Sequence, residues 1–522
     1  MKPRFGPKVI AMTGEAGRVD LAVETGPVIT VCSPATGHVI DSVPQVDAAA
    51  VAAVIGELRV AQPGWADLSA RARAAHLLRY RDWLLDNEFR LAQMLQRETG
   101  KPWAEANLEI PYIVDAINYY TRTAPRLLAD RAPERHGMIA ATKRQHLVQR
   151  PYPVVGVITP WNFPLGLSLL DAVPALLAGA AVVVKPSEFT PLTVAAAIEG
   201  WTAVGAPRVL ECVIGAGETG AAVVDNVDYV QFTGSARTGK AIAHAAAERL
   251  IPCGLELGGK DAMIVLDDAD LARAANAAVW GALANSGQMC VSVERVYVEA
   301  GVYDEFLRLV VEKLKALRVG EDDQQFRYDV GPLVTGAQLA IVCDHVDDAV
   351  SRGATIVVGG APIEGTSFFQ PTLLVDVDHT MLCMQRETFG PTLPVMKVRD
   401  EDEAVQLAND SDYGLSATVF SGDRARAERI ARRLDAGAVN INDVFGNLFT
   451  LSMPQGGWKQ SGLGRRNGAD AVLKYARPQA IVSARVQPAS EFIWYPYTAI
   501  RGAIVHRVGR LLGARDLLRR FS

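Results

Sequence analysis

The sequence predicts an α/β fold in which helices cover both faces of parallel β-sheets. From residue 153 onward, short Val- and Ile-rich runs alternate with Ala-rich helical stretches. The runs are apolar at successive positions, so both faces of each strand should be buried, as in parallel sheets between helical layers. A chain of 522 residues outgrows one hydrophobic core, so we expect two or three domains.

The alternation of strands and helices is clearest in the first α/β unit. Strands are expected at residues 154–158 (VVGVI), 180–186, 209–214 and 229–234, with helices at 167–179, 192–204, 217–226 and 238–250. Two further helical stretches, 47–60 and 72–100, precede it. In open sheets of this kind, ligands bind beyond the carboxyl ends of the strands.

A second α/β stretch runs from about residue 261 to 444. It opens with the strand DAMIVL and a helix over 268–287, followed by a strand at 293–300 and a helix at 303–319. Strand-like runs at 353–360 and 393–398 come later. No internal repeat or low-complexity segment interrupts this pattern.

Two alternating stretches stand apart from both units. Residues 144–150 (RQHLVQR) and 479–486 (QAIVSARV) alternate polar and apolar side chains. Exposed strands late in a large chain often pair with another subunit. We therefore expect segments 140–151 and 478–490 to be oligomerisation strands.

The C-terminal segment, residues 491–522, differs in charge from the rest. From residue 500 onward, isoleucine, valine and leucine side chains share one helical face. The same segment contains six arginines and only one acidic residue, Asp516. This pattern predicts a basic amphipathic helix. It fits packing on the protein's own oligomer, and it also fits docking on an anionic membrane surface.

Composition excludes several classes of protein. The formal net charge of −5 gives no overall basic field for nucleic acid. The 6 cysteines form no CxxC pair, so neither a zinc site nor a disulfide framework is expected, and reduced thiols suggest the cytosol. The N-terminus lacks the apolar core of a signal peptide. The apolar run 164–184 contains Asp171 and Pro174, which favours a buried helix followed by a strand over a membrane span.

The stretch NSGQMCVS, residues 285–292, contains a candidate nucleophile, Cys290. A free thiol is only a few per cent ionised at neutral pH, so it needs a base and a site for an oxyanion. Glu256 lies between two leucines in GLELGG; desolvation there would raise its pKa toward that of a general base. Taken alone, each residue also has a structural interpretation, Cys290 as a small core side chain and Glu256 as a strand residue.

Three further motifs follow predicted strands. TPWNFP, residues 159–164, presents the amide of Asn162, a good oxyanion donor. KPSE, residues 185–188, ends the next strand. FTGSARTG, residues 232–239, joins a strand to a helix N-terminus, where a pyrophosphate can bind, although it is not the usual GxGxxG.

Together these motifs resemble the aldehyde dehydrogenase superfamily. TPWNFP, KPSE, FTGS, ELGGK, GQMC, ETFGP and PQGGWKQSGLGR occur in the family's order between about residues 33 and 486. The resemblance implies an NAD(P)-dependent, non-acylating enzyme without a metal, with a Rossmann-type cofactor domain (1–139 and 152–260), an α/β catalytic domain (261–477) and a small β oligomerisation element. It also implies a homodimer or homotetramer in the cytoplasm.

The resemblance assigns roles to single residues. Cys290 is the nucleophile, Glu256 is the base that activates water to hydrolyse a thioester, and Asn162 holds the oxyanion together with the backbone N–H of Cys290. The implied cofactor-binding residues are Ile158, Thr159, Trp161, Lys185, Ser187, Glu188, Gly234, Ser235, Gly239, Leu257, Gly258, Glu387 and Phe389.

Within that set, Lys185 and Glu188 would bond the adenosine ribose. A carboxylate there favours NAD over NADP, because it repels a 2′-phosphate, although NADP stays open. Gly234 and Ser235 would take the pyrophosphate. Glu387 would bind the nicotinamide ribose, and Phe389 would pack near the nicotinamide ring.

The substrate is left open between two alternatives. The late motif continues with Arg466 where the family commonly has Glu, and this segment resembles one branch of succinate-semialdehyde dehydrogenases. Better-known enzymes of that activity carry two arginines at the positions occupied here by Leu170 and Ala284, so no cation is visible to pair a substrate carboxylate. The loop 444–451, which would face the substrate mouth, is apolar, and this favours an aliphatic or aromatic aldehyde. Rival functions are a catalytically silent relative and a CoA-acylating enzyme, but both Cys290 and Glu256 are present.

Overall fold

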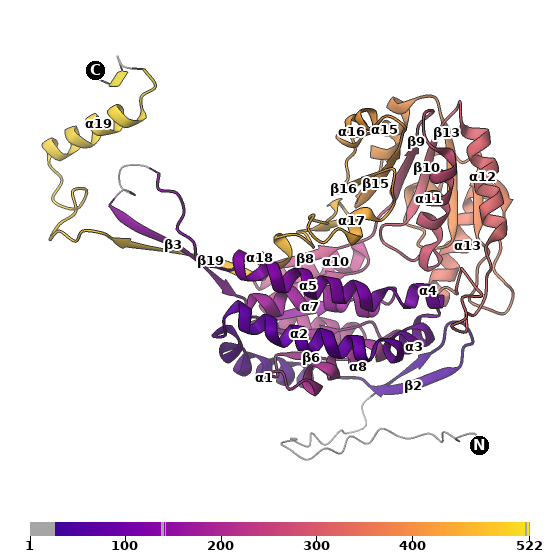
Figure 1. Cartoon of the computed structure of the whole chain (residues 1–522), viewed down its shortest axis with the longest axis horizontal. Helices are drawn as coiled ribbons and strands as arrows, with labels where there is room; N and C mark the ends of the chain where they lie inside the picture. Colours follow the sequence, from indigo (N-terminus) through magenta and orange to yellow (C-terminus); the bar gives the residue numbers. More distant parts are fainter. Residues whose placement is uncertain (1–26, 137–139, 141, 517–518, 521–522) are drawn as a thin grey trace.

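The computed structural model describes residues 27–136, 140, 142–516 and 519–520. The segment examined for a signal peptide (1–26) and Leu518 of the expected C-terminal helix therefore lie outside the described residues. The described chain forms two α/β lobes side by side, from which a long arm projects (Figure 1).

The first lobe is built on a six-stranded sheet with the order β18-β8-β7-β4-β5-β6. Its parallel strands are β4 (Val154–Ile158), β5 (Ala181–Lys185), β6 (Leu210–Cys212), β7 (Tyr229–Thr233) and β8 (Cys253–Glu256). The two-residue strand β18 (Gly462–Leu463) comes from late in the chain and pairs antiparallel with β8. Strands β4, β5 and β7 are buried at every position, as their continuous apolar runs predict.

Helices cover both faces of this sheet. They are α1 (Ala48–Ala66), α2 (Ala70–Asp86), α3 (Glu88–Thr99), α4 (Trp103–Ala106), α5 (Glu109–Leu127), α7 (Pro164–Ala178), α8 (Leu192–Ala203), α9 (Gly217–Asn226), α10 (Ala236–Glu248) and α18 (Asp470–Leu473). A hairpin of β1 (Val28–Cys32) and β2 (Val39–Pro44) lies at the edge of the lobe. The stretch expected as one helix over 72–100 is two helices, because the backbone leaves the helical conformation at Asn87.

The second lobe holds a seven-stranded sheet with the order β11-β12-β13-β10-β9-β15-β16. Its strands are β9 (Asp261–Val265), β10 (Val293–Glu299), β11 (Thr355–Val358), β12 (Thr372–Val375), β13 (Thr392–Val398), β15 (Ser416–Phe420) and β16 (Ala438–Ile441). Only β11, at the edge, pairs antiparallel with its neighbour within this described sheet. Thus the chain passes from the first sheet to the second between β8 and β9.

The helices of this lobe are α11 (Leu271–Leu283), the 3-10 turn η1 (Ala284–Gly287), α12 (Tyr303–Ala316), α13 (Gly336–Ser351), α14 (Leu382–Gln385), α15 (Glu401–Asn409), α16 (Arg424–Ala431) and α17 (Gly446–Phe449). Two short strands, β14 (Tyr413–Gly414) and β17 (Trp458–Lys459), pair with each other. The helix expected over 268–287 ends at Leu283, since the next residues turn into left-handed backbone.

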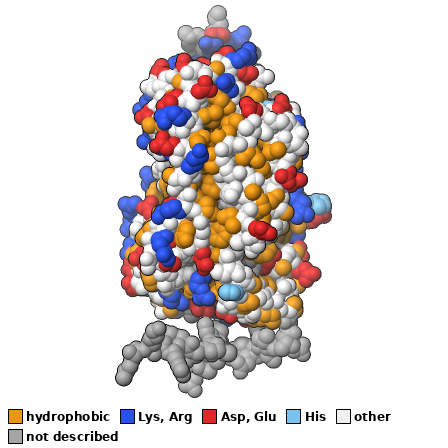
Figure 2. Space-filling view, turned by 90° about the vertical axis from the view of Figure 1, so that its right-hand side faces the viewer, with side chains coloured by type: hydrophobic (Ala, Val, Ile, Leu, Met, Phe, Trp, Pro, Cys, Tyr) orange, Lys and Arg blue, Asp and Glu red, His pale blue; other side chains and the backbone are white. Residues whose placement is uncertain are grey.

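The arm consists of β3 (Lys143–Pro151) and β19 (Ala476–Ala484), which pair antiparallel along their whole length. The two segments expected as separate oligomerisation strands are therefore partners within one chain. Beyond β19, helix α19 (Ala499–Gly513) lies far from both lobes (Figure 1). On the opposite end of the molecule, acidic and basic side chains are intermixed with apolar ones (Figure 2).

Candidate active site

Cys290 follows a left-handed turn between α11 and β10. Asn285, Ser286 and Gly287 all have positive φ, and a Cβ on Gly287 would lie 2.0 Å from the carbonyl oxygen of Gly390. Such a backbone costs free energy and persists only where its surroundings fix it. Here the N–H of Asn285 donates to Glu105 Oε1 at 2.8 Å. The turn therefore holds Cys290 in a fixed position where the two lobes meet.

Asn162 lies in the loop that connects β4 to α7. Its Nδ2 donates to the carbonyl oxygen of Gln288 at 2.8 Å, and its own carbonyl oxygen accepts a hydrogen bond from Lys101 Nζ at 2.8 Å. An amide nitrogen carries two hydrogens, so the second remains to be donated to a ligand. The side chain is buried, and its Oδ1 has no partner among the described residues.

Glu256 ends strand β8, where it pairs with Thr233 on β7 and Gly462 on β18. Burial raises the pKa of its carboxyl group to about 7, and the positive charges of Arg466 and Lys474 oppose that rise. A carboxyl group that titrates near neutral pH suits a general base.

One cavity of about 260 Å³ brings these three residues together. Asn162, Glu256 and Cys290 all line it. The three residues span 128 positions of the sequence, from Asn162 to Cys290, and come from both lobes. Burial raises the pKa of the Cys290 thiol to about 12, so this group needs a nearby proton acceptor to react as a thiolate.

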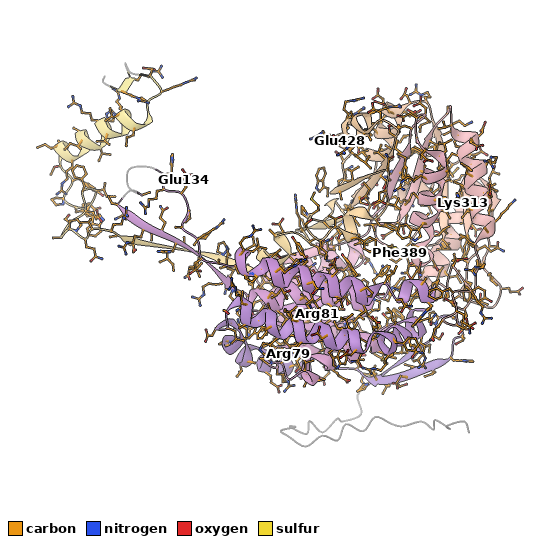
Figure 3. The ribbon with its side chains drawn as sticks, in the orientation of Figure 1. Arg79, Arg81, Glu134, Lys313, Phe389 and Glu428 are labelled. Carbon is orange, nitrogen blue, oxygen red and sulfur yellow. The ribbon has the colours of Figure 1, made fainter. Side chains whose placement is uncertain are left out.

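The same cavity contains half of the predicted cofactor set. Trp161, Gly234, Ser235, Leu257, Gly258, Glu387 and Phe389 line it. The rings of Trp161 and Phe389 meet edge to face with centroids 5.5 Å apart. Figure 3 places Phe389 at the junction of the lobes. Burial raises the pKa of Glu387 to about 8.

A second cavity of about 430 Å³ continues from the first past Pro160, Thr233 and Gly234, which line both. Ile158, Thr159, Lys185, Ser187 and Glu188 from the predicted set line it. The two cavities form one long cleft along the carboxyl ends of β4, β5 and β7, which is where this architecture binds nucleotides.

The cleft has the shape and chemistry that a dinucleotide requires. A Cβ on Gly258 would lie 2.4 Å from Glu387 Oε2, so only glycine leaves room beside that carboxylate. Helix α10 begins at this cleft, and its N-terminus favours negative charge. Gly239 lies outside the cavity linings; a Cβ there would be 2.5 Å from Leu257, so it allows α10 to pack on β8.

An apolar cavity of about 100 Å³ reaches Cys290 and Asn162 from the other side. Leu170 and Ala284 both line it. These are the two positions at which a cation could have paired with a substrate carboxylate. The apolar loop 444–451 adds Phe445, Leu448 and Phe449 to the lining. The sequence prediction that this loop faces the substrate side is consistent with this lining.

Several lining residues carried no signal in the sequence. Gln338 and Ile341 reach the cofactor side from α13, and Trp280 reaches the apolar cavity from α11. Each lies on a regular helix without a motif, so only the packing of the lobes brings it to the cleft. Tyr112, on α5, belongs to the apolar wall in the same way.

Comparison with known proteins agrees with this arrangement. The model of the aldehyde dehydrogenase family matches residues 22–481. A Mycobacterium ulcerans protein, provisionally named succinate-semialdehyde dehydrogenase (NADP+) 2, is 40% identical over 469 residues, 89% of this chain and 90% of that protein. A 4,4'-diapolycopene aldehyde oxidase of a Methylomonas species is 41% identical over 474 residues, 90% of this chain and 88% of that protein.

A solved structure of a succinate-semialdehyde dehydrogenase from Burkholderia pseudomallei superposes with a TM-score of 0.84 at 36% identity. The match covers 88% of this chain and 95% of that one. The α/β fold class predicted from the sequence is thereby confirmed. The chain belongs to the aldehyde dehydrogenase family, whose members oxidise aldehydes with NAD or NADP.

Proposed function

We propose that this aldehyde dehydrogenase oxidises apolar aldehydes to carboxylic acids through a thioester on Cys290. The observation that carries the proposal is that an apolar cavity and the dinucleotide cleft both reach Cys290 and Asn162. An aldehyde group entering from one side would meet the nucleophile, while the hydride acceptor approaches from the other side. Glu256 lines the shared cavity and completes the set of reacting groups.

The residues act in a physical order. Cys290 must lose its proton, and Glu256, which shares the cavity with a second carboxylate, Glu387, can accept it. The sulfur then attacks the carbonyl carbon, and the oxygen gains negative charge that the free amide hydrogen of Asn162 can stabilise. A dinucleotide held by the residues of the cleft would supply the acceptor for the hydride that leaves this carbon. The carbon is left as a thioester of Cys290.

Hydrolysis of the thioester releases the product. Once Glu256 has passed the thiol proton to solvent, its carboxylate removes a proton from water, and the water oxygen attacks the thioester carbon. The carbon–sulfur bond breaks, the acid leaves, and the sulfur of Cys290 is free for the next turnover. Because the donors are fixed before charge develops, their stabilisation is greatest along the reaction path.

The chemistry of the apolar cavity favours apolar substrates over succinate semialdehyde. Its lining contains no Lys or Arg among the described residues, whereas the carboxylates of Glu105 and Glu109 lie in its wall. The neighbouring cation, Lys101, is already engaged with Glu109 at 2.6 Å. A substrate carboxylate buried there would have no counter-charge and would meet like charge, which is costly. The relative from Methylomonas is named as an oxidase of 4,4'-diapolycopene aldehyde.

A substrate panel tests this proposal. Purified enzyme would be assayed with hexanal, decanal, benzaldehyde and succinate semialdehyde, with NAD and either water or CoA as the acyl acceptor. We expect kcat/KM for the best apolar aldehyde to exceed that for succinate semialdehyde by 100-fold or more, on the order of 3 kcal/mol. A preference for succinate semialdehyde would refute the substrate class. A CoA requirement, or no turnover at all, would support the acylating or silent alternative instead.

We also propose NAD as the preferred cofactor. Glu188 lines the far end of the cleft, 3.5 Å from Lys185 Nζ. Its carboxylate can accept from a ribose hydroxyl and repels a 2′-phosphate. Replacing Glu188 with Gln should raise kcat/KM for NADP relative to NAD. An unchanged ratio, or a native preference for NADP, would contradict this assignment.

The arm supports a homodimer or homotetramer. Strand β19 is exposed along most of its length, and no other described strand pairs with its outer edge, whereas Leu147 on the outer edge of β3 bridges Arg131. Edges of this kind are templates for strand pairing between subunits. Light scattering during gel filtration should give a mass of two or four chains. A Pro substitution at Ile481 should lower that mass, whereas a monomeric native enzyme would exclude this role.

Helix α19 supports contact with an anionic membrane surface, with the enzyme otherwise in the cytoplasm. Ile500, Leu511 and Leu512 are exposed, and Trp494 and Tyr495 precede the helix in exposed positions. None of the described helices combines the length and the mean hydropathy that a membrane span requires. Aromatic rings and arginines beside an exposed apolar face suit the membrane interface, where apolar aldehydes dissolve.

Co-sedimentation separates this role from packing within the oligomer. The full-length enzyme should bind vesicles that contain phosphatidylglycerol and release them at high salt, and it should bind phosphatidylcholine vesicles weakly. Replacing Leu511 and Leu512 with Asp should abolish binding while the oligomer persists. Loss of the oligomer without vesicle binding by the native enzyme would favour the packing alternative.

A further inference from the structure

A cluster of buried charges lies next to the strand that carries Glu256. Asp171, in the middle of α7, accepts from Arg466 Nη2 at 2.5 Å, from Lys474 Nζ at 3.2 Å and from the hydroxyl of Tyr475 at 3.2 Å. The side chains of Asp171 and Arg466 are 1% and 2% exposed. We call Asp171, Arg466 and Lys474 the buried triad.

The buried triad is bonded to β7, the strand beside Glu256. Arg466 Nη2 also donates to Thr233 Oγ1 at 2.8 Å, and Thr233 is the residue paired with Glu256 across β7 and β8. Lys474 Nζ donates to Gln231 Oε1 at 2.9 Å, two residues earlier on β7. None of the three triad side chains lines the cavities described above. They therefore touch no substrate or cofactor, and they act on the site through Thr233 and through their charge on Glu256 and Cys290.

Burial lowers the pKa of Lys474, and Asp171 opposes that fall; when Lys474 is protonated, the charges of this cluster balance only with Glu256 included. Arg466 and a protonated Lys474 carry two positive charges, and Asp171 carries one negative charge. The excess positive charge is neutralised when Glu256 is a carboxylate. Buried charges are strongly stabilised by a compensating partner, so the cluster favours the ionised form of Glu256.

We propose that Arg466 is a positioning residue for thioester hydrolysis, which keeps Glu256 in the carboxylate form that takes a proton from water. This inference rests on the proposed role of Glu256. It also gives a function to the position at which the sequence departs from its family, because a carboxylate at 466 would disfavour ionisation of Glu256.

The pKa of Glu256 supports the direction of the effect. Burial raises it to about 7; Arg466 lowers it most among the charged neighbours, followed by Lys474, while Asp171 raises it. The other titratable groups that face this site are Cys290 and Glu387, across the cavity, and Tyr229 on β7. Since they remain in an Arg466 variant, removing the arginine should raise the pKa of Glu256.

The experiment compares Arg466→Gln, Arg466→Lys and Asp171→Asn with the native enzyme between pH 6 and 9. The first-turnover burst of NADH and the steady-state kcat would both be measured. We expect Arg466→Gln to retain the burst but to move the midpoint of kcat toward alkaline pH by about one pH unit or more. Arg466→Lys should keep the native midpoint, and Asp171→Asn should move it in the acid direction.

Opposite shifts are the result that a merely structural role would not give. Arg465→Gln serves as the matched control, because Arg465 is the exposed neighbour of Arg466. Thermal unfolding identifies variants that do not fold; if Arg466→Gln is one of them, the Asp171→Asn midpoint decides the question. An unmoved midpoint in the folded variants overturns the inference.

Glu256→Gln separates this inference from the function on which it rests. If Glu256→Gln leaves steady-state turnover unchanged, the proposed role of Glu256 itself is wrong. If Glu256→Gln slows turnover but the triad variants keep the native midpoint, Glu256 retains its role and only the contribution of Arg466 is overturned.

Discussion

The side-chain amide of Asn162 donates from Nδ2 to the carbonyl oxygen of Gln288 at 2.8 Å, across 126 residues of sequence. This bond ties the loop before α7 to the turn that presents Cys290. It fixes the distance between the amide and the thiol before any substrate arrives. Preorganisation of this kind is what makes an oxyanion donor effective.

Replacing Asn162 with Ala should therefore lower kcat by roughly 100- to 1,000-fold, the usual cost of losing one oxyanion donor. KM should change much less, since in its proposed role the amide stabilises charge that appears only during the reaction. Steady-state kinetics on the best aldehyde would measure both constants. A KM effect without a kcat effect would assign Asn162 to substrate binding instead.

Cys290→Ala should abolish aldehyde oxidation, because no other thiol lies on the described cavities. Cys343→Ala, on α13, is the matched control and should keep native activity. Stopped-flow detection of NADH would show whether any burst remains. Turnover by Cys290→Ala would place the nucleophile elsewhere.

The pH profile of kcat should report Glu256. Its pKa of about 7 lies above the usual value for Glu because the group is buried, and a general base works only when it is deprotonated. The value of kcat should therefore rise as the pH is raised through about 7, and it should be low at more acidic pH. In Glu256→Gln, this rise of kcat with pH should disappear. The first-turnover burst of NADH should persist, and later turnovers should be slow.

An arginine in the apolar cavity should change substrate preference. Leu170→Arg introduces a cation into a wall that otherwise lacks one among the described residues. We expect kcat/KM for decanal to fall by 10-fold or more, while kcat/KM for succinate semialdehyde rises. Leu170→Met, of similar volume, is the control. Equal losses for both substrates would indicate blockage rather than recognition.

The buried pair Lys101–Glu109 should contribute strongly to stability. The two side chains are 0% and 3% exposed, and Lys101 also bonds the carbonyl oxygen of Asn162. Lys101→Met leaves Glu109 charged and buried, which should cost about 3–5 kcal/mol in the free energy of unfolding. Urea denaturation would measure this loss in the free energy of unfolding. Arg308→Met, at an exposed pair with Glu305, should leave the midpoint unchanged.

The sequence by itself determined the lobes, the family and the candidate nucleophile. Buried parallel strands require continuous apolar runs, and such runs mark β4, β5 and β7 directly. Motifs at strand ends are local signals too, because the carboxyl ends of parallel strands share one edge of the sheet. Asn162 and Glu256 could therefore be identified before their positions were known.

Only the tertiary structure decided which distant residues contact the site residues and which strands pair. The left-handed turn at Asn285 and Ser286 ended the expected helix early, since contacts from Glu105 and the tight approach of Gly390 override local helix preference. Likewise β3 and β19 became partners, although their sequences show only that each is exposed. The pairing of Asp171 with Arg466 joins residues 295 positions apart. Such contacts depend on how whole helices and strands pack. A short stretch of sequence shows the periodicity of its own side chains, but it does not show which distant element will pack against it.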